Sequence, residues 1–168
     1  LKNEKLIFDK KLIKKINQTK TNGNIDFNKD YIILMQHPVT TEYEQAQYQI
    51  DETIKAVKVL TKKIQIIWLW PNVDAGSDIF SRRIRRFREK NPNAKNLLFY
   101  KNFTPEEYAV VLKNCSCIVG NSSSGIKETP VFCCPCVNIG SRQKGRLRSN
   151  NVIDVSYNSY EIVKAVKY

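Results

Sequence analysis

Short, continuously apolar runs alternate with longer amphipathic segments along this chain of 168 residues. Apolar runs of about four to eight residues that do not alternate with polar ones are typical of strands covered on both faces. The segments between them repeat apolar residues every three or four positions, which is the spacing of a helix with one buried face. Strands that alternate with helices predict an α/β fold with a doubly wound parallel sheet of about six strands. The predicted strands are Tyr31–Gln36, Ile64–Trp70, Asn96–Tyr100, Cys117–Gly120, Cys136–Ile139 and Val152–Val155.

Two of the predicted helices carry signals at their N-termini. Thr41 and Glu44 have the spacing of a capping box, and an apolar helical face follows them. Thr104 is followed by a proline and then by Glu107, which combines an N-cap, a first-turn proline and an N3 glutamate. We therefore expect helices to begin at both places.

Composition excludes several classes of protein. A hydrophobic content of 42% is too high for a disordered chain, and no apolar run approaches the ~20 residues of a membrane-spanning helix. The absence of a signal-peptide pattern predicts a cytoplasmic protein with no membrane partner. Because the chain begins with Leu1 and not Met, we expect it to be part of a longer protein. We predict a basic N-terminal helix and linker over residues 1–30 and one α/β domain over residues 31–168.

The net charge of +12 favours polyanions and phosphates as partners. Its densest part is the arginine cluster between Arg82 and Arg88, for which a solvated helix face is favoured over nucleic-acid binding. The five cysteines are crowded between Cys115 and Cys136. A structural metal site would need paired Cys-x-x-Cys ligands, and these cysteines do not form two such pairs. We therefore predict reduced, packed thiols and no metal.

In open parallel sheets ligands bind beyond the carboxyl ends of the strands, so the loops after the strands are the candidate functional segments. His37, the only histidine, follows the first strand and either serves a phosphate or a proton transfer, or is structural. Asn72 follows the second strand and either faces a ligand or, as is favoured from the local sequence, builds a turn. Phe103 follows the third and either contacts a base or acts as a hydrophobic staple.

The loop after the fourth strand has the strongest chemical signature. Small hydroxyl and glycine residues, with Ser122 and Ser123 among them, precede a helix predicted to begin near Gly125. Free backbone N–H groups, serine hydroxyls and a helix dipole would together hold a phosphate. Glu128, one turn further on, either accepts hydrogen bonds from ribose hydroxyls or stabilises the helix. Arg142 lies on the loop after the fifth strand, which is rich in cations and suited to a diphosphate.

Four loop sequences, in this order, resemble the signatures of the hydrolysing UDP-N-acetylglucosamine 2-epimerase family. The similar region spans about residues 31–155. The His-Pro-Val-Thr-Thr form of the first loop points to the hydrolysing branch and not to the one that carries Gly-His-Arg-Arg. The four sequences are Gln-His-Pro-Val-Thr-Thr-Glu, Pro-Asn-Val-Asp-Ala-Gly-Ser, Gly-Asn-Ser-Ser-Ser-Gly-Ile and Asn-Ile-Gly-Ser-Arg-Gln-Lys-Gly-Arg.

The resemblance implies a two-lobed enzyme of glycosyltransferase-B type, of which this chain is the C-terminal, Rossmann-like, nucleotide-binding lobe. The implied reaction eliminates UDP from UDP-N-acetylglucosamine and adds water to give N-acetylmannosamine, in the synthesis of sialic or legionaminic sugars, without a cofactor. The acid and base carboxylates would lie on the N-terminal lobe, so the chain by itself is expected to be inactive. The full-length form could be a homo-oligomer. The alternatives to the epimerase lobe are a UDP-sugar lobe of a glycosyltransferase and, less favoured, a basic nucleic-acid-binding module.

The resemblance also implies a role for individual residues. His37, as a catalytic residue, and Asn72 would approach the diphosphate, Phe103 the uracil, Ser122 and Ser123 the phosphates, Glu128 the ribose, and Arg142 the phosphate side. Cys133 departs from the family pattern, because it stands where the family commonly has glycine. If the backbone there has a positive φ, a cysteine would be strained by about 1 kcal/mol.

Overall fold

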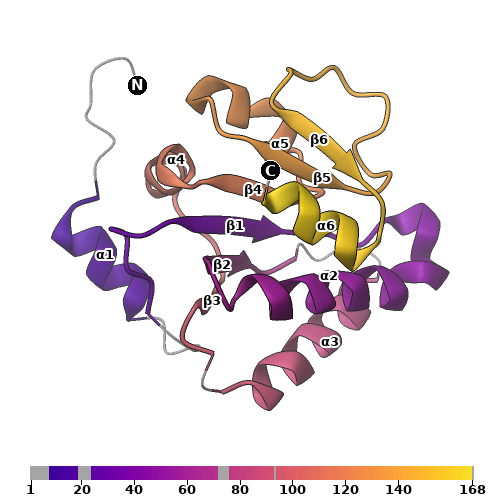
Figure 1. Ribbon diagram of the computed structural model, residues 1–168, viewed down its shortest axis with the longest axis horizontal. Coiled ribbons are helices and arrows are strands. Elements are labelled where there is room, and N and C mark those ends of the chain that lie inside the picture. The colour runs from indigo at the N-terminus through magenta and orange to yellow at the C-terminus, as the bar shows by residue number, and fades with distance from the viewer. Residues whose placement is uncertain (1–7, 19–23, 72–75, 93, 168) are drawn as a thin grey trace.

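The computed structural model describes residues 8–18, 24–71, 76–92 and 94–167, which form a parallel sheet with helices on both faces (Figure 1). The sheet has six strands in the order β3-β2-β1-β4-β5-β6, and every neighbouring pair is parallel. The predicted α/β class and all six predicted strands are confirmed, with strand ends that differ by one residue or less. The strands are β1 (Tyr31–Met35), β2 (Gln65–Leu69), β3 (Leu97–Tyr100), β4 (Cys117–Gly120), β5 (Cys136–Ile139) and β6 (Val152–Val155).

The helices divide into two layers because each face of the sheet has its own apolar cluster. One cluster joins the sheet to α2, α3 and α6, and the other joins it to α1, α4 and the segment around α5 (Figure 1). None of the described helices is long and apolar enough to cross a membrane. The helices are α1 (Lys10–Asn17), η1 (Thr40–Gln45), α2 (Ala46–Leu60), α3 (Ser77–Lys90), α4 (Pro105–Asn114), α5 (Ser124–Lys127), η2 (Thr129–Phe132) and α6 (Ser159–Val166), where η denotes a 3₁₀ helix.

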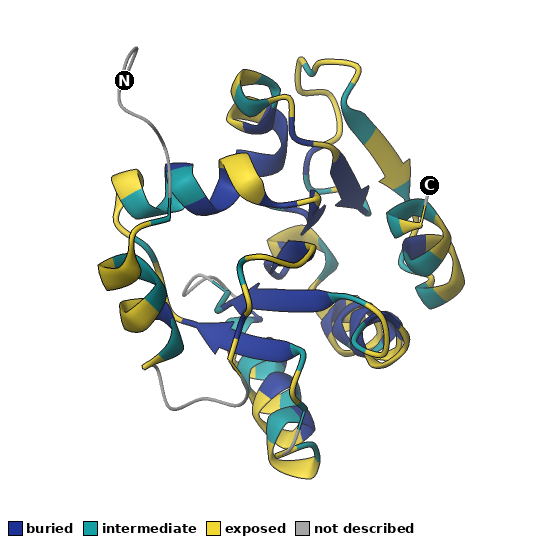
Figure 2. Cartoon of the chain, turned by 60° about the vertical axis from the view of Figure 1, so that its left-hand side comes forward, coloured by how far each residue is buried: buried dark blue, intermediate teal, exposed yellow. Residues whose placement is uncertain are grey.

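The central strands are buried on both faces, as their unbroken apolar sequences predict (Figure 2). Trp68 of β2 is fully buried, with its ring centroid 5.4 Å from that of Phe99 and 6.3 Å from that of Phe87. On the opposite face, the hydroxyl of the buried Tyr31 donates to the carbonyl of Val111 in α4 at 2.6 Å. The sheet is thus held between its two helical layers by large side chains.

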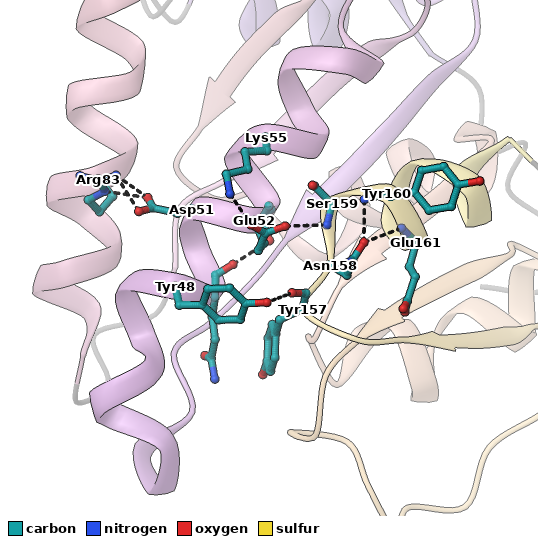
Figure 3. A network of polar contacts seen from close by, with 12 residues as sticks. Tyr48, Asp51, Glu52, Lys55, Arg83, Tyr157, Asn158, Ser159, Tyr160 and Glu161 are labelled. Carbon is teal, nitrogen blue, oxygen red and sulfur yellow. Dashed lines mark hydrogen bonds and ion pairs between the residues drawn. The ribbon is translucent and has the colours of Figure 1, made fainter.

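The last helix is fastened to α2 by polar contacts (Figure 3). The amide of Ser159 donates to a carboxylate oxygen of Glu52 at 2.8 Å, and Glu52 is also paired with Lys55 at 2.5 Å. The hydroxyl of Tyr48 donates to the carbonyl of Tyr157 at 2.8 Å. These contacts place α6 beside α2, although the two helices are far apart in the sequence.

One predicted helix start is wrong. The capping box expected at Thr41 is not formed: residues 40–45 make a 3₁₀ helix without a side-chain cap, and α2 begins at Ala46. Glu42 departs from helical geometry with φ −123°, while its carboxylate accepts a hydrogen bond from Gln49 at 2.6 Å. The second capping box is confirmed, because Thr104 and Glu107 bond each other's backbone at the start of α4.

Candidate functional site

The candidate site lies where the chain changes direction across the sheet. β1 and β4 are adjacent, but the strands that follow them, β2 and β5, lie on opposite sides of this pair. The loops leaving β1 and β4 therefore separate and leave a crevice at their carboxyl ends, which is where ligands bind in sheets of this order. His37 follows β1 in this crevice, and the loop with Ser122 and Ser123 follows β4.

A pocket of about 490 Å³ opens at this place. It brings together five of the seven residues predicted from the sequence, although they come from three different loops. These five are His37, Phe103, Ser122, Ser123 and Glu128, and further lining residues include Trp70, Lys101, Tyr108 and Ser124. The other two predicted residues are Asn72, which lies outside the described residues, and Arg142, which lies beside the pocket.

Asn121 connects the loops around the pocket. Its side chain is fully buried; Oδ1 accepts from the amide of His37 at 2.7 Å, and Nδ2 donates to the carbonyl of His37 at 2.8 Å. The carbonyl of Asn121 in turn accepts from Nε2 of the buried Gln143 at 2.7 Å and from Nη1 of Arg142 at 3.2 Å. One asparagine therefore fixes the backbone of His37 and the loop after β5. No sequence signal singles out Asn121, because a side chain that bonds a distant backbone leaves no periodic pattern.

The loop after β4 offers hydrogen-bond donors to the pocket. Within the described part of the chain, the amides of Ser122 and Ser123 donate to no backbone carbonyl. The helix that follows is α5, which has only four residues before the chain turns into η2. The helix dipole therefore contributes little here, because one turn aligns few peptide dipoles. The capacity to hold an anion depends on the free amides and the serine hydroxyls.

Glu128 belongs to a chain of hydrogen bonds that ends in the pocket. The hydroxyl of Ser124 donates to Oε2 of Glu128 at 3.0 Å and lies 2.5 Å from the hydroxyl of Tyr108. Ser124 and Glu128 are four residues apart, so they lie on the same side of the turn. Burial raises the pKa of Tyr108, and its phenol is consequently protonated at neutral pH.

Phe103 packs between two tyrosines. Its ring centroid lies 4.2 Å from that of Tyr100 and 6.4 Å from that of Tyr108. Tyr108 is the fourth residue of α4 and Phe103 precedes the N-cap, so this contact is the predicted hydrophobic staple. Because Phe103 also lines the pocket, the staple does not exclude contact with a ligand.

A second pocket of about 520 Å³ lies between the loop after β1 and the loop after β5. It is lined by residues 38–42 together with Ser141 and Arg142. The hydroxyl of Ser141 donates to Glu42, which joins the two loops. His37 lines the first pocket and the next residue, Pro38, lines the second, which Arg142 also lines.

Most of the cysteines are packed in the interior. No group of three or more potential ligands that could hold a metal occurs among the described residues. Four of the five thiols are buried, and the Sγ atoms of Cys115 and Cys134 are 3.4 Å apart. Cys133 is exposed and has φ 53°, so it has the positive φ that was considered for this position because the family commonly has glycine there.

Comparisons with known proteins agree with this arrangement. Residues 3–168 match the family model of UDP-N-acetylglucosamine 2-epimerase. A Campylobacter jejuni protein named GDP/UDP-N,N'-diacetylbacillosamine 2-epimerase (hydrolyzing) is 33% identical over 134 residues, which cover 80% of this chain and 34% of that protein. The chain thus spans about a third of the length of the curated relatives that it matches.

Solved structures show the same fold. A UDP-GlcNAc 2-epimerase from Methanocaldococcus jannaschii superimposes with a TM-score of 0.68 at 16% identity, covering 95% of this chain and 42% of that one. The same organism's UDP-GlcNAc 2-epimerase in complex with UDP-GlcNAc and UDP gives a TM-score of 0.61 at 18% identity, covering 84% and 39%. At these identities the likeness concerns the fold.

Proposed function

Because this chain belongs to the UDP-N-acetylglucosamine 2-epimerase family, we propose that it is the C-terminal, UDP-binding lobe of a hydrolysing UDP-N-acetylglucosamine 2-epimerase. The observation that carries the proposal is the pocket of about 490 Å³ at the crevice between β1 and β4. This pocket combines amide and hydroxyl donors that could bind phosphates, a carboxylate that could bind ribose hydroxyls, and aromatic rings that could contact a nucleotide base.

We place the nucleotide in this pocket as follows. The uracil lies against Phe103, and the ribose hydroxyls donate to Glu128. The diphosphate accepts hydrogen bonds from the amides and hydroxyls of Ser122 and Ser123, and from His37. Asn72 and Arg142 approach the phosphates from the neighbouring loops.

The reaction that we propose for the complete protein is the elimination of UDP from UDP-N-acetylglucosamine, followed by addition of water to give N-acetylmannosamine and UDP. In that reaction negative charge builds on the diphosphate as the bond to the sugar breaks. Donors that are already oriented toward the phosphate oxygens stabilise this charge without reorganising. We propose that His37, whose backbone is held by the side chain of Asn121, donates to the leaving phosphate.

Abstraction of the C2 proton requires a base, and the pocket supplies no pair of carboxylates for acid and base roles among its described lining residues. We propose that these groups belong to the N-terminal lobe of the complete protein, and that this chain by itself binds UDP without turnover. The boundary between residues 1–30 and the nucleotide-binding domain over residues 31–168, the cytoplasmic location and a homo-oligomeric full-length form also stay predictions.

Calorimetric titration of the chain with UDP and with UDP-N-acetylglucosamine tests the proposal. We expect saturable binding of both with similar affinity, because the sugar would be contacted mainly by the missing lobe. Ser122→Ala should weaken UDP binding about tenfold, since a hydrogen bond to a charged group contributes about 1.5 kcal/mol. Ser81→Ala, on α3 and outside the pocket, is the matched control and should bind as the unmodified chain does. Absence of UDP binding, or equal losses in the two variants, would refute the assignment of the pocket.

A further inference from the structure

We infer that Tyr108 and Ser124 act as positioning residues that make the pocket selective for ribonucleotides over 2′-deoxyribonucleotides. The inference rests on the proposed UDP site and assigns a determinant of specificity within it. It follows from the hydrogen-bonded chain that runs from the hydroxyl of Tyr108 through Ser124 to the carboxylate of Glu128.

The direction of the hydrogen bonds in this chain is determined by the number of protons. The hydroxyl of Ser124 has a single proton, which it donates to Oε2 of Glu128 at 3.0 Å. At the 2.5 Å contact with Tyr108 the serine oxygen must then be the acceptor, and the phenol the donor. Because burial keeps the phenol protonated, this direction holds throughout the neutral pH range. Each donor polarises the next, so the hydrogen bond from Ser124 to the carboxylate is stronger than the same bond would be without Tyr108.

The relay leaves one side of the carboxylate available. Within the described part of the chain, Oε1 of Glu128 accepts no side-chain or backbone hydrogen bond. Glu128 itself is exposed at the pocket, whereas Ser124 is only 6% exposed. An exposed glutamate on a short helix would otherwise change rotamer freely, and each ordering of its side chain on binding would cost free energy. Fixing Oε2 orients Oε1 for the pair of hydroxyls of a ribose before the ligand arrives.

Tyr108 also couples the carboxylate to the part of the pocket that faces the base. Its ring packs against Phe103 with a centroid distance of 6.4 Å, and its hydroxyl reaches Ser124. One side chain thus sets the position of Glu128 relative to Phe103, and this relative position decides whether a base and a ribose can be bound together. Loss of the phenolic hydroxyl would leave the aromatic packing intact but remove the donor that holds the hydroxyl of Ser124 in its orientation toward Glu128.

Binding of UDP and 2′-deoxy-UDP by Tyr108→Phe tests the inference, because the ratio of the two affinities isolates the contact with the 2′-hydroxyl. We expect the unmodified chain to prefer UDP by about tenfold, the value of one hydrogen bond to a charged group. Tyr108→Phe and Ser124→Ala should each lower this preference to about threefold, mainly by weakening UDP. Glu128→Gln should abolish most of it, and addition of Tyr108→Phe to Glu128→Gln should change the preference no further, because the two act through one path.

Tyr100→Phe is the matched control. Tyr100 also packs on Phe103, but its hydroxyl makes no hydrogen bond to Ser124, so the preference for UDP should stay unchanged. Thermal unfolding of each variant checks that the fold is intact, and Ser124→Ala serves if Tyr108→Phe does not fold. If UDP binds but Tyr108→Phe weakens UDP and 2′-deoxy-UDP equally, the inference is wrong and the proposed function stands. If the unmodified chain binds neither nucleotide, both fall together.

Discussion

Cys133 occupies a backbone conformation that an L-residue adopts at a cost. Among the described residues it is the one non-glycine with positive φ, at 53° with ψ 30°. It follows the last residue of η2, and the amide of Cys134 bonds back to the carbonyl of Thr129 at 3.0 Å. The left-handed residue therefore reverses the chain so that it can enter β5. We expect Cys133→Gly to stabilise the fold.

The size of the effect follows from two opposing contributions. An L-residue in the left-handed region costs about 1–2 kcal/mol relative to the right-handed one. Glycine gains freedom in the unfolded chain, which reduces the benefit by about 0.4–1 kcal/mol. Since the thiol of Cys133 is exposed, its removal sacrifices little packing. The net gain in the free energy of unfolding should be about 0.8 kcal/mol.

Urea unfolding in the presence of a reductant, followed by tryptophan fluorescence, measures this gain. With a denaturant slope of about 2 kcal/mol per molar, the midpoint should rise by about 0.4 M. Cys133→Ser removes the thiol but keeps the Cβ atom, so its midpoint should remain close to that of the unmodified chain. If Cys133→Gly unfolds at the same urea concentration as Cys133→Ser, the backbone at this position is not strained and the reasoning fails.

Two further predictions concern the frame around the site. Gly120→Ala should prevent folding, because a Cβ atom there would lie 2.0 Å from the carbonyl oxygen of Met35 in the neighbouring strand and φ is 133°; native circular dichroism of the purified variant would contradict this. The hydrogen bonds from Lys55 and from the amide of Ser159 lower the pKa of Glu52 below its unfolded value of about 4.3. This carboxylate therefore contributes stability that is fully present above the unfolded pKa and is lost as the pH falls through the lower folded pKa. Glu52→Gln should therefore unfold about 1 kcal/mol more easily at pH 7, and the difference should shrink below about pH 4; a constant difference at all pH values in urea titrations would oppose this assignment.

The sheet could be predicted from the sequence because its physical signal is local and strong. Each central strand is buried on both faces, so its residues are apolar without interruption, as in Tyr31–Met35. Helix starts were less certain, since a capping box depends on which partners its side chains find. At Thr104 both bonds of the box form and the prediction is confirmed. Near Thr41 no side-chain cap forms, residues 40–45 make a 3₁₀ helix, and α2 begins later.

The residues that line the pocket could be anticipated from their places after strands, whereas those that support them could not. Asn121 acts on a backbone 84 residues away, and nothing in its own neighbourhood indicates that partner. Tyr108 fits the apolar side of α4 equally well with or without a role for its hydroxyl. The end of α5 could not be predicted either: the chain turns at Thr129, whose hydroxyl donates to the carbonyl of Gly125 at 2.7 Å.

The strand order has a consequence for how this chain folds during its synthesis on the ribosome. β1, β2 and β3 are neighbours both along the chain and across the sheet, so this half can assemble while the rest is still being made. His37 emerges with that early half, but the asparagine that clamps it arrives only with β4. A nascent chain that ends before β4 would expose the unpaired backbone N–H and C=O groups of β1, which could pair with a strand of another chain. The pocket proposed for the nucleotide is therefore complete only after β4 and the loop that follows it have been made.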